Sequence, residues 1–127
     1  MRDKHLKEAR PAIILTTQFS TELEKFQNIT LRPILKMQNS ITQILLNNSL
    51  AFNKIKKKIK IQDDKLHREA IDNFVGTNLV FKNQLLGCIK GVMTEKELLF
   101  YFEHESEFNK RIIAMQKERY WDVYKNQ

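Results

Sequence analysis

Residues 21–39 read TELEKFQNITLRPILKMQN, and they contain Pro33, the last proline of this 127-residue chain. Proline and glycine are the residues that most disfavour the interior of a helix, so a chain that lacks them can form long helices. After Pro33 the only such residues are three glycines, and these are also the only glycines of the whole chain: Gly76, Gly87 and Gly91. The sequence therefore predicts an all-α fold.

The first predicted helix begins at a capping box, in which Thr21 is followed three residues later by Glu24. A proline inside a helix removes one hydrogen bond and clashes with the carbonyl four residues earlier, here that of Ile29. We expect a helix that is kinked near Pro33, or split there with Thr30 as a new N-cap. The apolar spacing of three and four continues through Pro33, which favours the kink. The predicted core positions are Leu23, Phe26, Thr30, Ile34, Met37, Ile41, Ile44, Asn48, Phe52, Ile55 and Ile59.

Two further helices are predicted. The second starts at Asp63 or Asp64, whose carboxylates can accept hydrogen bonds from the first turn, and it ends near Gly91. The third starts at another capping box, Thr94 with Glu97, and ends close to the C-terminus. Their predicted core positions are Leu66, Ala70, Phe74, Thr77, Phe81, Leu85, Cys88 and Val92, followed by Leu98, Phe102, Glu105, Phe108, Ile112, Met115 and Arg119.

Connections this short join antiparallel neighbours, so residues 21–127 are predicted to form one domain, an elongated antiparallel three-helix bundle. Long apolar stripes need cover along their whole length, so a homodimer is a further expectation. Residues 1–20 are predicted to form an N-terminal arm with little helix, because Pro11 biases Arg10 away from helical geometry. Part of this arm should lie in a groove of the bundle or against a partner, because it contains Ile13, Ile14, Leu15 and Phe19.

Composition favours a cytoplasmic globular protein. Hydrophobic residues make up 42% of the chain and charged residues 29%, as in ordinary folded domains. The single cysteine, Cys88, cannot form an internal disulfide, so nothing indicates an oxidising compartment. The apolar run at residues 12–15 is much shorter than a signal-peptide core or a membrane span. We therefore expect cytoplasmic localisation and no membrane span.

The net charge of +7 is concentrated at the end of the first predicted helix. Such a cluster could bind nucleic-acid phosphates or an anionic membrane surface. The alternative is structural, because lysines in a last turn complement the negative end of the helix dipole. This alternative is favoured, since no aromatic side chain lies among the lysines to stack on nucleic-acid bases. The cluster consists of Lys54, Lys56, Lys57, Lys58 and Lys60.

Motifs for catalysis or cofactor binding are absent. The sequence has no glycine-rich phosphate loop and no recognisable nucleophile motif, so we predict no cofactor and expect no enzyme. Its histidines, His5, His67 and His104, lie far apart, and only Asp64 and His67 have the spacing of a helical ligand pair. A di-metal bundle needs two Glu-x-x-His pairs, so we predict no metal site.

Polar residues at predicted core positions are the remaining candidates for a site. Burial of such groups is costly unless they form hydrogen bonds, so they imply an internal polar network or a polar-lined cleft. The alternative is that Glu105 and Arg119 form ion pairs at a helix edge. The candidate network consists of Asn48, Asn73, Thr77, Gln84, Glu105 and Arg119.

Several segments resemble the signature of a family of small all-helical bacterial proteins whose members are often labelled glyoxalase. The main one is FQNITLRPILKMQN at residues 26–39. Shorter ones follow in similar order and spacing at 81–87, 94–97, 109–111 and 117–119. The resemblance implies an all-helical fold and assigns no site. A metal-dependent glyoxalase resembles paired βαβββ modules, and this sequence has no strand pattern for them, so its residues do not support that label.

Three functions remain open. The absence of catalytic motifs favours a structural or protein-interaction bundle that recognises an unidentified partner protein. The second is a nucleic-acid-associated module that uses the lysine cluster. The third is a small-ligand binder or an enzyme with a polar cleft in the bundle.

Overall fold

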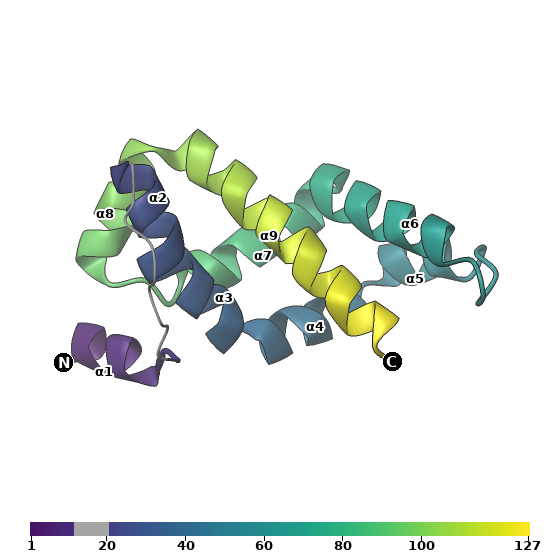
Figure 1. The fold of residues 1–127 in the computed structure, drawn as a ribbon, viewed down its shortest axis with the longest axis horizontal. Coiled ribbons are helices and arrows are strands. Elements are labelled where there is room, and N and C mark those ends of the chain that lie inside the picture. The colour runs from purple at the N-terminus through teal and green to yellow at the C-terminus, as the bar shows by residue number, and fades with distance from the viewer. Residues whose placement is uncertain (12–20) are drawn as a thin grey trace.

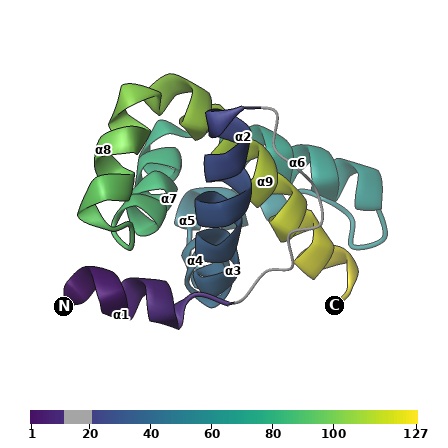
Figure 2. The same ribbon diagram turned by 60° about the vertical axis from the view of Figure 1, so that its left-hand side comes forward.

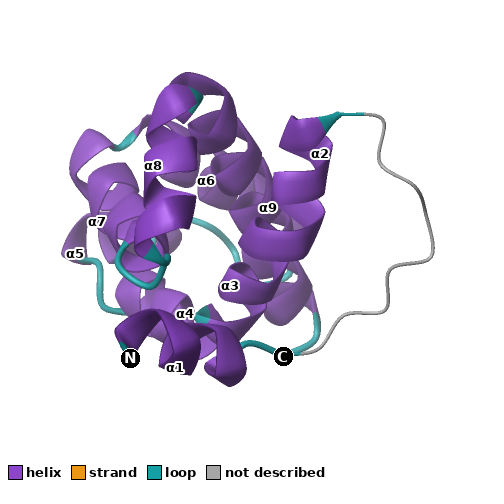
Figure 3. Cartoon of the chain, turned by 90° about the vertical axis from the view of Figure 1, so that its left-hand side faces the viewer, coloured by secondary structure: helices purple, strands orange, loops and turns teal. Residues whose placement is uncertain are grey.

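The computed structural model describes residues 1–11 and 21–127, and every regular element among them is a helix. Figure 1 shows an elongated molecule with the longest helix, α9, running diagonally through its middle. The prediction of an all-α fold is confirmed, as Figure 3 shows. The elements are α1 (Arg2–Ala9), α2 (Glu22–Phe26), the π-helical turn η1 (Gln27–Leu31), α3 (Arg32–Met37), α4 (Asn39–Asn47), α5 (Leu50–Lys56), α6 (Asp64–Thr77), α7 (Leu79–Lys90), α8 (Glu95–Glu103) and α9 (Glu105–Lys125).

The prediction of three long helices is not confirmed, because each of them is divided. Ser49 divides the first predicted helix, because it caps the start of α5: its hydroxyl accepts from the Phe52 N–H at 3.2 Å. Asn78 divides the second in the same way, accepting from the Phe81 N–H at 3.0 Å. His104, at φ −135° and ψ 35°, separates α8 from α9. Internal caps therefore produce shorter helices that change direction.

The chain remains helical through Pro33. The Arg32 N–H donates to the carbonyl of Gln27, five residues earlier, which is the hydrogen bond of a π-helical turn. Pro33 follows this turn as the second residue of α3. Thr30 is buried inside η1 and is not an N-cap. A π-helical turn therefore occupies the place of the predicted kink or split.

One hydrophobic core runs through the described residues, and α9 lies at its centre. This helix packs against η1, α6, α7 and α8, and it buries Phe108, Ile112 and Tyr120 completely or nearly so. The Phe26 ring of α2 lies 4.6 Å from the Phe108 ring, measured between centroids. No helix among residues 1–11 and 21–127 is long and apolar enough to cross a membrane.

The N-terminal arm contains more helix than expected, because α1 spans eight residues. Figure 2 shows α1 beside the connection between α7 and α8. The Arg2 guanidinium donates to the carbonyls of Gly91 and Met93, each at 2.9 Å. Arg10 has the extended geometry expected before Pro11. The predicted docking of the arm's apolar side chains lies outside the described residues: Ile13, Ile14, Leu15 and Phe19.

Candidate functional site

A pocket of about 640 Å³ lies between the N-terminal arm, the segment from α2 to α3, and α8. We call it the arm groove. Its walls combine aromatic and aliphatic side chains with an acidic and three basic ones. The residues that line it are Lys7, Arg10, Pro11, Phe26, Ile29, Thr30, Pro33, Lys96, Glu97 and Phe100.

A paired carboxylate forms the polar wall of the arm groove. The Arg10 guanidinium donates to both oxygens of Glu97, each at 2.7 Å, and the two side chains are only 8% and 12% exposed. Glu97 also accepts from the Thr94 N–H at 2.8 Å and from the Thr30 hydroxyl at 3.4 Å. Bidentate charge-assisted bonds fix geometry strongly, so this wall is rigid.

The local sequence explains how Glu97 reaches this position. Thr94 caps α8 by accepting from the Glu97 N–H at 3.2 Å, and Glu97 completes the predicted capping box. The same carboxylate then meets Arg10, which lies just after α1 and also donates to the Val92 carbonyl at 3.1 Å. One side chain therefore both caps a helix and anchors the arm.

The Glu97 carboxyl is held in its ionised form. Burial raises its pKa, but hydrogen bonds from Arg10 and Thr94, together with the charge of Arg10, outweigh burial and place the pKa below its ordinary value. An acid–base catalyst at neutral pH needs a pKa near 7, which this carboxyl does not have. The pair therefore suits a structural and binding role.

Two further apolar side chains of α8 are exposed outside the arm groove. Leu99 is 69% exposed and Phe102 is 51% exposed, although both belong to a helix that also packs on the core. At about 100° per residue, Phe102 lies on the side of α8 opposite Glu97 and Phe100, and the Lys90 ammonium lies 5.8 Å from the centre of its ring. Leu99 and Phe102 are therefore not part of the arm groove.

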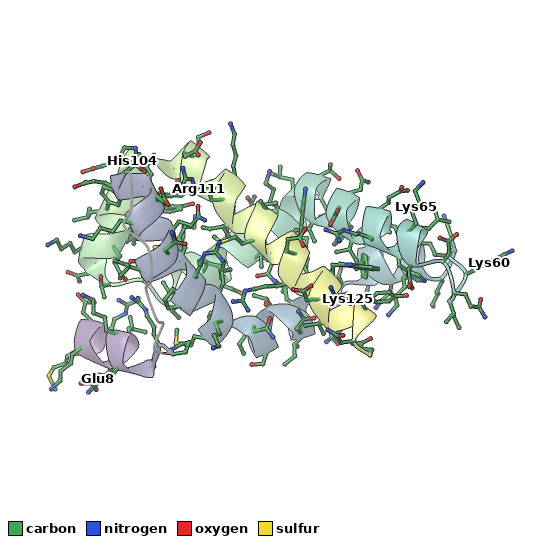
Figure 4. All side chains as sticks on the ribbon, viewed as in Figure 1. Glu8, Lys60, Lys65, His104, Arg111 and Lys125 are labelled. Carbon is green, nitrogen blue, oxygen red and sulfur yellow. The ribbon has the colours of Figure 1, made fainter. Side chains whose placement is uncertain are left out.

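The lysine cluster lies at the opposite end of the molecule. Lys54 and Lys56 belong to the last turn of α5, as predicted, and the other three follow that helix. All five are exposed, and none takes part in an ion pair within the described part of the chain. Figure 4 shows Lys60 at the extreme end of the long axis.

The predicted polar network does not form, because five of its members are exposed and Arg119 is half-buried without an ion pair to Glu105. Asn48 lies directly after α4, Thr77 is the last residue of α6, and Glu105 is the first residue of α9. Helix ends need polar groups and face solvent, which explains these three. The exposed members are Asn48, Asn73, Thr77, Gln84 and Glu105.

A different polar network is buried instead. The Tyr120 hydroxyl donates to the Thr42 carbonyl at 2.7 Å, and the Gln116 amide donates to the Thr42 hydroxyl at 3.3 Å. Burial is the main cause of the raised pKa of Tyr120. Gln116 directly follows the predicted core position Met115. A prediction with the buried face of α9 shifted by one residue would have included it. These contacts join α4 to α9 inside the core.

The histidines do not form a metal site. His67 is buried, its Nε2 donates to the Lys60 carbonyl at 3.0 Å, and its ring lies 4.9 Å from that of Tyr124. The described residues contain no group of three His, Cys, Asp or Glu side chains that could hold a metal ion.

Comparison with known proteins finds no family model, no curated protein and no solved structure that matches this chain.

Proposed function

We propose that this chain is a protein-interaction module whose arm groove binds a short apolar segment of another protein that carries an acidic side chain. The observation that carries the proposal is the combination of an apolar groove with a rigid ion-paired wall. A pocket of about 640 Å³ lies within the size range of specific binding sites. Its apolar surface comes from Phe26, Ile29, Pro33 and Phe100, and a mostly apolar pocket with a few fixed polar groups is typical of binding sites.

Charge supports the acidic character of the bound segment. The negative charge of Glu97 is matched by Arg10, so it does not repel an incoming carboxylate. Lys7 and Lys96 line the groove and form no ion pair among the described residues, so their charges are available to a partner. Complementary charge at the rim of an interface guides association and selects among partners.

A random peptide library displayed on phage and selected on the full-length protein tests this proposal. We expect enriched peptides that combine large apolar residues with Asp or Glu. The Ile29→Asp variant places a carboxylate in the groove wall and should weaken a selected peptide about tenfold or more. Ile44→Asp is the matched control, because Ile44 is also an exposed isoleucine but lies on α4, outside the groove.

A charge-reversal pair tests the acidic requirement separately. Lys7→Glu combined with Lys96→Glu should weaken the same peptide, whereas Lys57→Glu combined with Lys58→Glu at the other end should not. Failure to enrich any peptide, or equal affinity of wild type and Ile29→Asp, would refute the proposal. If the protein forms a homodimer and Ile29→Asp dissociates it, then the arm groove binds a second copy of this chain and not a different protein.

A further inference from the structure

The end of the molecule opposite the arm groove is strongly basic. We call residues 54–65 the basic tip; they contain six lysines and two aspartates. The Asp63 carboxylate accepts from the Leu66 N–H at 3.1 Å, so it is engaged in capping α6. Figure 1 places this connection between α5 and α6 at one end of the long axis. The tip therefore presents mainly positive charge to its surroundings.

An apolar side chain protrudes among these charges. Ile61 is 84% exposed and directly follows Lys60. Ile55 and Leu66 flank it on the neighbouring helices and are also exposed. An isoleucine held in water at the end of a basic loop has no stabilising role in the fold itself.

The basic tip is held in place by the body of the protein. The buried His67 donates from Nε2 to the Lys60 carbonyl at 3.0 Å, and its ring packs against Tyr124 of α9. The Asp63 N–H donates to the same carbonyl at 3.0 Å. The turn that carries Ile61 is therefore ordered before any partner arrives.

We infer that the basic tip binds the surface of an anionic membrane. Lysines near such a surface are attracted to acidic headgroups, and apolar side chains enter the boundary between headgroups and acyl chains. Ile61 decides between this partner and a nucleic acid, because phosphate binding leaves an exposed isoleucine without a contact. The tip also contains no aromatic side chain on which a base could stack.

Sedimentation with lipid vesicles tests the inference on the full chain. We expect binding to vesicles of phosphatidylcholine with phosphatidylserine, and none to phosphatidylcholine alone. Ile61→Ser should lower the partition coefficient about tenfold, because the apolar contact is lost. Lys57→Ala and Lys58→Ala should each lower it about fivefold, and salt should weaken binding. Leu79→Ser is the matched control, since Leu79 is exposed at the start of α7.

Three results would overturn the inference. The first is no binding to phosphatidylserine vesicles at low salt, and the second is binding that Ile61→Ser leaves unchanged. The third is binding to single-stranded RNA or DNA that the lysine variants weaken and Ile61→Ser does not, which would assign the tip to a nucleic acid. Ile61 is on the surface, so its variant should keep the thermal midpoint of the wild type, and circular dichroism verifies this.

Discussion

Removal of one partner from the Arg10–Glu97 pair is the most direct test of how the N-terminal arm is held. Arg10→Met keeps most of the apolar stem but leaves Glu97 with hydrogen bonds only from Thr94 and Thr30. Glu97→Gln keeps an acceptor for Thr94 but leaves a nearly buried guanidinium without its counter-charge. Each variant therefore leaves one charge without the partner that lies 2.7 Å away in the wild type.

The expected cost follows from this geometry. Removing one partner of a fully buried ion pair typically costs about 3–5 kcal/mol, and an exposed pair is worth at most about 1 kcal/mol. Side chains that are 8% and 12% exposed lie closer to the buried limit. We expect each single variant to lose about 2–3 kcal/mol of unfolding free energy and the double variant about 3 kcal/mol. The coupling energy is then about 2 kcal/mol.

Urea denaturation of the four proteins, followed by circular dichroism, measures this cycle. A coupling energy below about 0.5 kcal/mol would refute the reasoning, because the pair would then behave as a surface ion pair. An altered m-value in any variant would show that the substitution has changed the compactness of the folded or the unfolded state.

The difference in unfolding free energy between wild type and Glu97→Gln should depend on pH, which provides an independent check of the ion pair. The pKa of Glu97 in the folded protein lies below its ordinary value of 4.5, so its carboxylate stabilises the fold above that pH. This contribution is lost as the pH falls from about 4.5 through the lowered pKa. The stability difference between wild type and Glu97→Gln should therefore be constant near neutral pH and shrink in acid.

Two further substitutions test the core and a helix interior, both by urea midpoint. Tyr120→Phe should cost about 1–2 kcal/mol, because it leaves the buried Thr42 carbonyl without the hydroxyl that donates to it at 2.7 Å. Gly87→Ala should stabilise by about 0.5–1 kcal/mol, because its new Cβ in α7 meets no atom within 4 Å. Gly91→Ala is the comparison, since its Cβ would lie 3.0 Å from the Gly87 carbonyl, and a larger gain there would contradict the steric argument.

Helix starts were predictable because a cap is a local signal. Thr21, Asp63 and Thr94 each accept from a first-turn N–H as their spacing predicts. The sequence does not predict the internal breaks, because apolar spacing places the polar residues at those points in the core. Asn48 and Thr77 instead lie at helix ends, where solvent satisfies them. A polar residue in an apolar stripe is therefore better explained here as a helix end than as part of a network.

The register of each stripe was lost at these breaks. In α4 the buried residues are Thr42 and Leu46, not the predicted Ile41 and Ile44, because Gln38 at φ −87° and ψ 5° interrupts the helix before them. The break at His104 likewise leaves Phe102 exposed. The spacing of apolar residues therefore predicts which face of a helix is buried only within one uninterrupted helix.

Local sequence patterns cannot predict the arm groove, because its residues come from distant parts of the chain. Glu97 was predicted only as part of a capping box, and its partner Arg10 lies 87 residues earlier in the chain. A contact of this separation leaves no periodic signal, and it depends on how the arm returns to α8. The lysine cluster, in contrast, was found because charge density is local. Composition reveals an exposed charged end, while a paired charge is recognised only in three dimensions.

The two proposed sites depend on charge to different extents, and this constrains how they can act together. At the arm groove the charges of Arg10 and Glu97 cancel within the fold, so apolar contact dominates recognition and only Lys7 and Lys96 attract an acidic side chain. At the basic tip the lysines have no ion-pair partner in the described part of the chain, so attraction there is strong and sensitive to salt. The sites lie at opposite ends of the long axis (Figure 1), so both can be occupied at once. Salt should therefore weaken membrane binding much more than peptide binding.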